Sequence, residues 1–306
     1  MRTAFAARLT ELADADDRIV LLTGDLGFTV LEPFAERHPD RFFNAGVAEQ
    51  NMVGLATGLA EAGFIPFAYS IATFATLRPY EFIRNGPALH RLPVRIVGIG
   101  GGIDYGHNGV THFALEDVGV MRLQPEITTI VPADREQTRA ALDAIADLDR
   151  PVYLRLGRLG DPVPKLEGRF RVGRLEVLAD GGDAALIALG PLAQAALAAR
   201  ELLERDGIRA TVAVVSSFNP SPEEDVRELL AGVPVAATVE GHYRIGGLGS
   251  FVAEVVADAG LGTRIARIGV EAMPHGLTGS EDFLAEKLGL TPAAIAASVT
   301  EALHRL

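Results

Sequence analysis

Short apolar runs alternate with longer segments of helical periodicity along the whole chain. The apolar runs are rich in Val, Ile and Ala and show little polar alternation, as expected of strands buried on both faces of a sheet. The helical segments include 192–207, which ends at Gly207, a common helix C-cap. The pattern predicts an α/β fold on parallel sheets. The expected strands lie in 18–24, 65–70, 94–100, 127–133, 151–157, 184–190, 210–216, 235–240 and 264–270.

This rhythm is interrupted at residues 157–174, where prolines and glycines break the periodicity and the density of charge rises. A chain of 306 residues is also longer than one typical hydrophobic core supports. We therefore predict two parallel-sheet domains, residues 1–160 and 175–306, joined by a linker at 161–174.

The composition is that of an ordinary soluble globular protein, with 48% hydrophobic and 22% charged residues. A net charge of -12 argues against a nucleic-acid-binding surface. The absence of cysteine excludes disulfides and thiolate metal sites and fits a cytoplasmic protein. No signal-peptide or membrane-spanning pattern is present in the sequence. We expect a cytoplasmic protein with neither nucleic acid nor membrane as a partner.

Several common catalytic motifs are missing. The glycines at 98 and 100–102 do not complete G-x-G-x-x-G, and there is no phosphate loop, nucleophile elbow or H-E-x-x-H motif. The seven histidines do not fall at metal-ligand spacing. We expect no metal ligands in this chain, and the absence of built-in reactive apparatus indicates chemistry that belongs to a cofactor.

A helix is predicted to begin near Val47, after the strand-like run at 41–46. Glycines and alanines four residues apart would let another backbone approach it closely, either within the chain or across an interface. The core stripe predicted from helical spacing comprises Met52, Leu55, Leu59 and Ala62.

Glu49 stands in the first turn of this helix, where the helix dipole favours a carboxylate. One interpretation is a solvated acid that helps the helix to start. The other is a buried acid that hydrogen-bonds the ring of a ligand, because a charged side chain is seldom buried without a partner. Local sequence alone favours the first interpretation.

A wider set of motifs changes that balance. The residues G-V-A-E-Q-N at 46–51, T-F at 73–74, G-V-T-H at 109–112 and E-D at 116–117 occur in this order and spacing. Together they resemble the pyrimidine-binding domain of transketolases, and the second half, with TVEGHYRIGGLGSFVAEVV from residue 238, resembles their C-terminal domain. The resemblance covers nearly the whole chain.

The resemblance implies thiamine diphosphate as the cofactor. Glu49 matches the family's glutamate that hydrogen-bonds a ring nitrogen of the aminopyrimidine, and it is the expected catalytic acid. Phe74 matches an aromatic residue that stacks on this ring, and Leu77 stands where some relatives have a second aromatic residue. Asp25 matches an aspartate near the cofactor or the subunit interface.

Substrate-facing residues are implied in the same way. His112 matches the histidine that faces the substrate near the reactive carbon, as a second catalytic residue. Asn108 stands where many transketolases have an aspartate that binds a sugar hydroxyl, and His107 replaces an acidic residue. These two departures put the stereoselectivity of sugar recognition in doubt.

Phosphate recognition is implied by two further positions. Arg158 matches an arginine that holds the substrate phosphate, with Arg155 as a weaker candidate and a domain-edge salt bridge as the structural alternative. Thr29 stands where a serine contacts phosphate. A histidine typical of transketolases is expected near Gly100 and is absent, which removes a phosphate or hydroxyl contact.

The family's G-D-G motif and asparagines, which hold the diphosphate and its cation, are not found. We therefore expect the C-terminal subunit of a split transketolase, which transfers a two-carbon ketol unit between a ketose phosphate and an aldose. A separate N-terminal subunit would bind the diphosphate and Mg²⁺ or Ca²⁺, in a heterotetramer of two of each chain. The alternatives are a deoxyxylulose-phosphate synthase-like enzyme, the beta subunit of a 2-oxo-acid dehydrogenase, and an inactive binding or regulatory relic.

Overall fold

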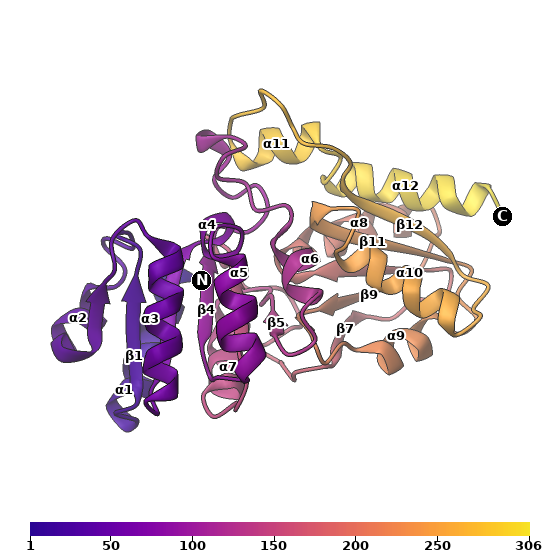
Figure 1. Cartoon of the computed structure of the whole chain (residues 1–306). Coiled ribbons are helices and arrows are strands. Elements are labelled where there is room, and N and C mark those ends of the chain that lie inside the picture. The colour runs from indigo at the N-terminus through magenta and orange to yellow at the C-terminus, as the bar shows by residue number, and fades with distance from the viewer.

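The structure is a computed structural model that describes residues 1–306, and it forms two α/β units side by side (Figure 1). All nine predicted strands are confirmed. They are β1 (Ile19–Thr23), β3 (Ile65–Ile71), β4 (Arg95–Ile99), β5 (Thr128–Ile130), β6 (Val152–Leu156), β8 (Ala184–Leu189), β9 (Ala210–Val215), β11 (Val235–Tyr243) and β12 (Arg264–Val270). The three further strands are β2 (Phe42–Asn44), β7 (Leu175–Ala179) and β10 (Ser217–Phe218).

The first sheet has seven strands in the order β10-β5-β6-β4-β3-β1-β2. Its helical segments are α1 (Arg2–Ala15), α2 (Glu32–Arg37), η1 (Pro39–Arg41), α3 (Glu49–Glu61), α4 (Ala72–Thr76), α5 (Tyr80–Ile83), η2 (Arg84–Ala88), η3 (Gly106–Asn108), α6 (Asp117–Arg122) and α7 (Arg135–Ile145). Buried side chains of α1 and α7 form one core on this sheet, and those of α3, α5 and α6 form the other. The sheet is therefore covered on both faces, as its apolar strands require.

The second sheet has five strands in the order β12-β11-β8-β9-β7. Its helical segments are η4 (Gly190–Leu192), α8 (Ala193–Arg205), α9 (Glu223–Leu230), α10 (Leu248–Asp258), α11 (Glu281–Lys287) and α12 (Pro292–His304). Side chains of α8 and α12 pack on one face, and those of α9 and α10 pack on the other. No helix of the chain is both long and apolar enough to span a membrane.

Two edge strands depart from the parallel pattern. β7 is antiparallel to β9, and β10 is antiparallel to β5. The short strand β10 comes from the second half of the chain but completes the sheet of the first half. Residues 157–174 contain neither helix nor strand, yet Val163 and Leu166 are buried in the core of the second unit. The two units are thus joined by packing and by strand pairing.

The buried face of α3 differs from the predicted one. Met52 is buried as expected, but Leu55 is 48% exposed. The face toward the sheet carries Val53, Ala56 and Ala60 instead. Small side chains there let the helix lie close to the strands, so the stripe with more leucines is left outside. Gly54 and Gly58 lie on the outer side, where a Cβ would meet no atom within 4 Å.

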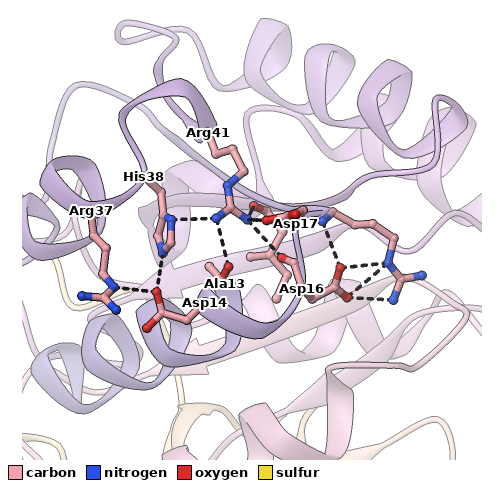
Figure 2. A network of polar contacts seen from close by, with 9 residues as sticks. Ala13, Asp14, Asp16, Asp17, Arg37, His38 and Arg41 are labelled. Carbon is pink, nitrogen blue, oxygen red and sulfur yellow. Dashed lines mark hydrogen bonds and ion pairs between the residues drawn. The ribbon is translucent and has the colours of Figure 1, made fainter.

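A polar network joins the C-terminal end of α1 to η1 (Figure 2). The Arg41 guanidinium donates to the carbonyl of Ala13 at 2.9 Å and to that of Asp16 at 3.0 Å. The His38 ring lies 2.6 Å from the same guanidinium and 3.2 Å from an Asp14 carboxylate oxygen. These contacts satisfy the carbonyls at the end of α1 and hold η1 against it, because helix C-termini leave carbonyls without partners.

Candidate functional site

The predicted site residues follow the carboxyl ends of strands in the first sheet. Asp25 and Thr29 follow β1, Glu49 follows β2, Phe74 follows β3, and Arg158 follows β6. In parallel α/β sheets, ligands bind outside the carboxyl ends of the strands. The topology thus brings residues from distant parts of the sequence to one edge of the sheet.

Glu49 is the first residue of α3 and is only 2% exposed. The Ser70 hydroxyl donates to its Oε1 at 2.9 Å, and the Arg78 guanidinium donates to its Oε2 at 2.8 Å. A Cβ on Gly24 would lie 3.5 Å from Oε1, so the backbone of the β1 loop also lies close to it. The interpretation as a solvated helix-start acid is therefore wrong, because this carboxylate is dry and fixed by donors.

Phe74 is half-buried and forms one wall beside this carboxylate. Its ring contacts the His112 ring edge-on, with centroids 5.1 Å apart. The guanidinium carbon of Arg78 lies 4.0 Å from the Phe74 centroid. Since Arg78 also bonds Glu49, the carboxylate and the aromatic face border the same small space. Phe74 is thus not an ordinary core phenylalanine.

His112 lies in the loop after β4 and has two neighbours in addition to Phe74. Its Nδ1 is 3.0 Å from the Thr111 hydroxyl, and its ring centroid is 6.1 Å from that of Tyr105. His107 and Asn108 belong to η3 and are exposed. This loop is braced by the second unit, because the amide of Gly279 donates to the carbonyl of Gly106 at 3.1 Å.

Arg158 is exposed, and its guanidinium bonds a main-chain carbonyl rather than a carboxylate. It donates to the main-chain carbonyl of Asp104 at 3.0 Å and lies 5.1 Å from the centroid of Tyr105. Burial raises the pKa of the Asp104 carboxyl, although a hydrogen bond from the Arg158 amide opposes the rise. The domain-edge salt bridge is therefore not observed, and a cationic fork remains open to an anion.

Arg155, the weaker phosphate candidate, has a structural role instead. It is 5% exposed, and its Nε lies 3.1 Å from an Asp117 carboxylate oxygen. Its guanidinium also donates to the carbonyls of Ala114 and Gly241, at 3.1 and 2.8 Å. Gly241 belongs to the second unit, so Arg155 ties the two units together. It is not available to a substrate.

The remaining predicted residues, Asp25, Thr29 and Leu77, follow the carboxyl ends of β1 and β3. Asp25 is exposed, has a φ of 59°, and accepts from the Asn44 amide at 2.8 Å. Thr29 has a φ of 67°, and its amide donates to Glu32 at 2.7 Å. Leu77 ends α4 and is 42% exposed. These side chains are accessible, but no contact joins them to Glu49.

Sequence reasoning did not assign roles to Ser70, Arg78 and Tyr105. Arg78 stands four residues after Phe74, and this spacing places two side chains on one helical face. That spacing could have indicated their contact. Ser70 and Tyr105 offered no such signal, because their positions depend on how β3 and the β4 loop are folded.

Tyr105 lies against Gly100, near which a histidine is expected from the resemblance. A Cβ at Gly100 would be 2.1 Å from Cε2 of Tyr105, and the φ of Gly100 is +75°. Glycine is therefore required here for two independent reasons. Tyr105 fills the space that a larger residue would take, and it contacts both His112 and Arg158.

We expect Gly100→Ala to destabilise the chain by about 1–3 kcal/mol, through overlap with Tyr105 and backbone strain. Gly54→Ala is the matched control, because this exposed helical site has room for a Cβ. The control should be neutral or stabilise by up to about 1 kcal/mol. Urea denaturation of both variants measures the difference. Equal stability of the two variants would contradict the packing of Tyr105 on Gly100.

Comparisons with known proteins identify the two domains of the chain. Residues 1–160 match the family model for the pyrimidine-binding domain of transketolase, and residues 173–295 match the model for the transketolase C-terminal domain. A "putative transketolase C-terminal section" of Methanocaldococcus jannaschii is 38% identical over 309 positions, covering 100% of this chain and 96% of that protein.

Of two further relatives, one is about twice as long as this chain and the other is of similar length. The 1-deoxy-D-xylulose-5-phosphate synthase of Syntrophotalea carbinolica is 35% identical over 98% of this chain, which matches 48% of that synthase. A solved structure described as a split gene transketolase, inactive beta4 tetramer, has a TM-score of 0.90 and 39% identity. That match covers 99% of this chain and 98% of that one.

Proposed function

Because this chain belongs to the transketolase family, we propose that it is the C-terminal subunit of a split, thiamine-diphosphate-dependent transketolase. Family membership implies dependence on thiamine diphosphate. One observation carries the proposal. The buried carboxylate of Glu49 and the aromatic face of Phe74 both contact one flat, cationic donor, the Arg78 guanidinium. The similar split-gene protein and the similar C-terminal section support the two-chain organisation.

The residues present fit the ring of this cofactor. The space between Glu49 and Phe74 already accepts a planar group that donates to the carboxylate and stacks on the ring, namely the Arg78 guanidinium. An aminopyrimidine protonated at its ring nitrogen has the same two properties. The acceptor carboxylate of Glu49 and the flat face of Phe74 therefore match the ring in charge and in shape.

Glu49, Ser70 and Phe74 then have distinct roles toward the ring. Glu49 holds the proton at the ring nitrogen, and Ser70 fixes the orientation of its carboxylate through the bond to Oε1. Phe74 supports the ring by stacking. When bound, the cofactor would supply a carbon nucleophile for a ketose carbonyl. Burial of Glu49 excludes water from the proton it shares, which keeps this interaction strong.

His112 and Arg158 form the substrate side of the proposed site. Tyr105 lies beside the His112 ring and the Arg158 guanidinium. It therefore holds the histidine and the cation on one wall of the proposed site. His112 can bond a substrate oxygen or move a proton, and Arg158 can hold a phosphate. Asn108 and His107 stand nearby in η3 and would contact the sugar hydroxyls.

The diphosphate and its cation would be held by a second chain. No group of three or more His, Asp or Glu side chains is placed to hold a metal ion. Divalent cations that bridge phosphates need several oxygen ligands. We therefore assign Mg²⁺ or Ca²⁺ and the diphosphate to a separate subunit, in an assembly of two of each chain.

Reconstitution tests this function. We expect the chain alone to show no ketol transfer from xylulose 5-phosphate with thiamine diphosphate and Mg²⁺. Addition of a diphosphate-binding subunit, encoded next to this chain, should produce transfer to an aldose acceptor. Full activity of the lone chain would contradict the split organisation. Activity only with pyruvate as the donor would favour the deoxyxylulose-phosphate synthase class, which the similar synthase represents.

A further inference from the structure

Arg78 makes two contacts, and both are with residues assigned to the cofactor ring. Its guanidinium donates to Oε2 of Glu49 at 2.8 Å. The same guanidinium lies over the ring of Phe74, with 4.0 Å between its central carbon and the ring centroid. The Arg78 side chain makes no other hydrogen bond or ion pair.

The guanidinium shares its chemistry with the ring that Glu49 and Phe74 are proposed to bind. A guanidinium is flat, delocalised and rich in donors, and it stacks readily on aromatic faces. A protonated aminopyrimidine is also flat and also donates to a carboxylate. Two such groups cannot stack on the same face of Phe74, beside Glu49, at the same time.

We propose that Arg78 competes with the cofactor's aminopyrimidine for Glu49 and Phe74, and leaves when the ring binds. This inference rests on the proposed function and adds a residue that sets cofactor affinity. The guanidinium keeps the buried carboxylate paired until the ring replaces it. An unpaired buried carboxylate would be costly, because charges removed from water need a partner.

The surroundings of Arg78 allow it to leave. Its side chain is 45% exposed, whereas that of Glu49 is 1% exposed. The exposed guanidinium can be rehydrated when it leaves, and the incoming ring replaces it as the partner of the buried carboxylate. Glu49 keeps the hydrogen bond from Ser70 after the arginine has moved. Arg78 can therefore swing into solvent while the carboxylate stays in place.

Competition of this kind lowers the apparent affinity for the ring. The apparent Kd is the intrinsic Kd divided by the fraction of molecules in which the site is free. Removal of the guanidinium should therefore tighten ring binding rather than weaken it. A residue that merely supports the site would show the opposite sign.

The test uses the full chain and the pyrimidine half of the cofactor, 4-amino-5-(hydroxymethyl)-2-methylpyrimidine, titrated with ligand-observed NMR. We expect Arg78→Ala and Arg78→Gln each to tighten binding by about tenfold. Arg84→Ala is the matched control, because Arg84 is exposed nearby and bonds only Asn85. Its Kd should equal that of the unmodified chain.

Two further variants separate this inference from the proposed function. Glu49→Gln and Phe74→Ala should both weaken binding of the pyrimidine. If they have no effect, the proposed ring site is wrong, and the inference fails with it. If they weaken binding while both Arg78 variants bind equally or more weakly than the unmodified chain, only the competition is refuted. If neither the unmodified chain nor the two Arg78 variants bind the pyrimidine, the proposed competition is also refuted.

Discussion

Glu49→Gln should reduce ketol transfer by the reconstituted two-chain enzyme on the order of 10³-fold, while leaving the chain folded. Glutamine keeps the size of the side chain and can still accept from Ser70, but it cannot hold a proton at the ring nitrogen. Initial rates with xylulose 5-phosphate measure the loss. We expect the loss in kcat to exceed any change in KM, because Glu49 contacts the cofactor ring and not the sugar.

The matched control is Glu61→Gln at the other end of α3, where the side chain is exposed. This variant should retain full activity. Circular dichroism of both variants would verify that the helix is intact. Full activity of Glu49→Gln would refute the proposed role of the carboxylate. Equal losses in the two variants would point to damage of α3 rather than to lost chemistry.

Arg155→Met is expected to cost about 3–5 kcal/mol of stability, the largest loss among the substitutions considered. The reason is the buried Asp117, which would lose its cationic partner at 3.1 Å. Asp117 would keep only the Tyr153 hydroxyl, which donates at 2.6 Å. Burial raises the pKa of Tyr153, so this hydroxyl stays protonated and cannot neutralise the carboxylate.

Urea denaturation of the full chain measures this loss. Arg135→Met is the control, because Arg135 is half exposed and lies 3.9 Å from the nearest carboxylate oxygen. Its stability should change by less than about 0.5 kcal/mol. A double variant, Arg155→Met with Asp117→Leu, should recover part of the loss, because no buried charge remains unpaired. A loss below about 1 kcal/mol in Arg155→Met would contradict the structural role.

The strands were predictable because each is a short run of apolar residues flanked by turn-forming residues. The two antiparallel edge strands were not, since β10 has only two residues and its partner strand lies in the other half of the chain. The buried face of α3 was also predicted wrongly. Helical spacing shows which residues share a face, but the choice between a leucine face and an alanine face depends on how closely the helix approaches the sheet.

Within the candidate site, the motifs identified Glu49, Phe74, His112 and Arg158, and the structure places Phe74 in contact with His112. The resemblance ranked Arg158 above Arg155, which stands three residues earlier, but it could not show which of the two side chains is accessible. Arg158 is exposed and Arg155 is buried among carbonyls of both units. Part of that difference arises because Gly241 of the second unit accepts a hydrogen bond from Arg155.

The sequence by itself determined the α/β class, the positions of nine strands and the resemblance that points to a thiamine-diphosphate enzyme, because these depend on local pattern and on residue order. Only the tertiary structure decided that Glu49 is buried and that Arg78 lies between it and Phe74. Burial and pairing depend on which distant segments meet at the carboxyl edge of the sheet. A helix-start glutamate has the same local sequence whether it faces water or a dry pocket, so packing alone distinguishes the two.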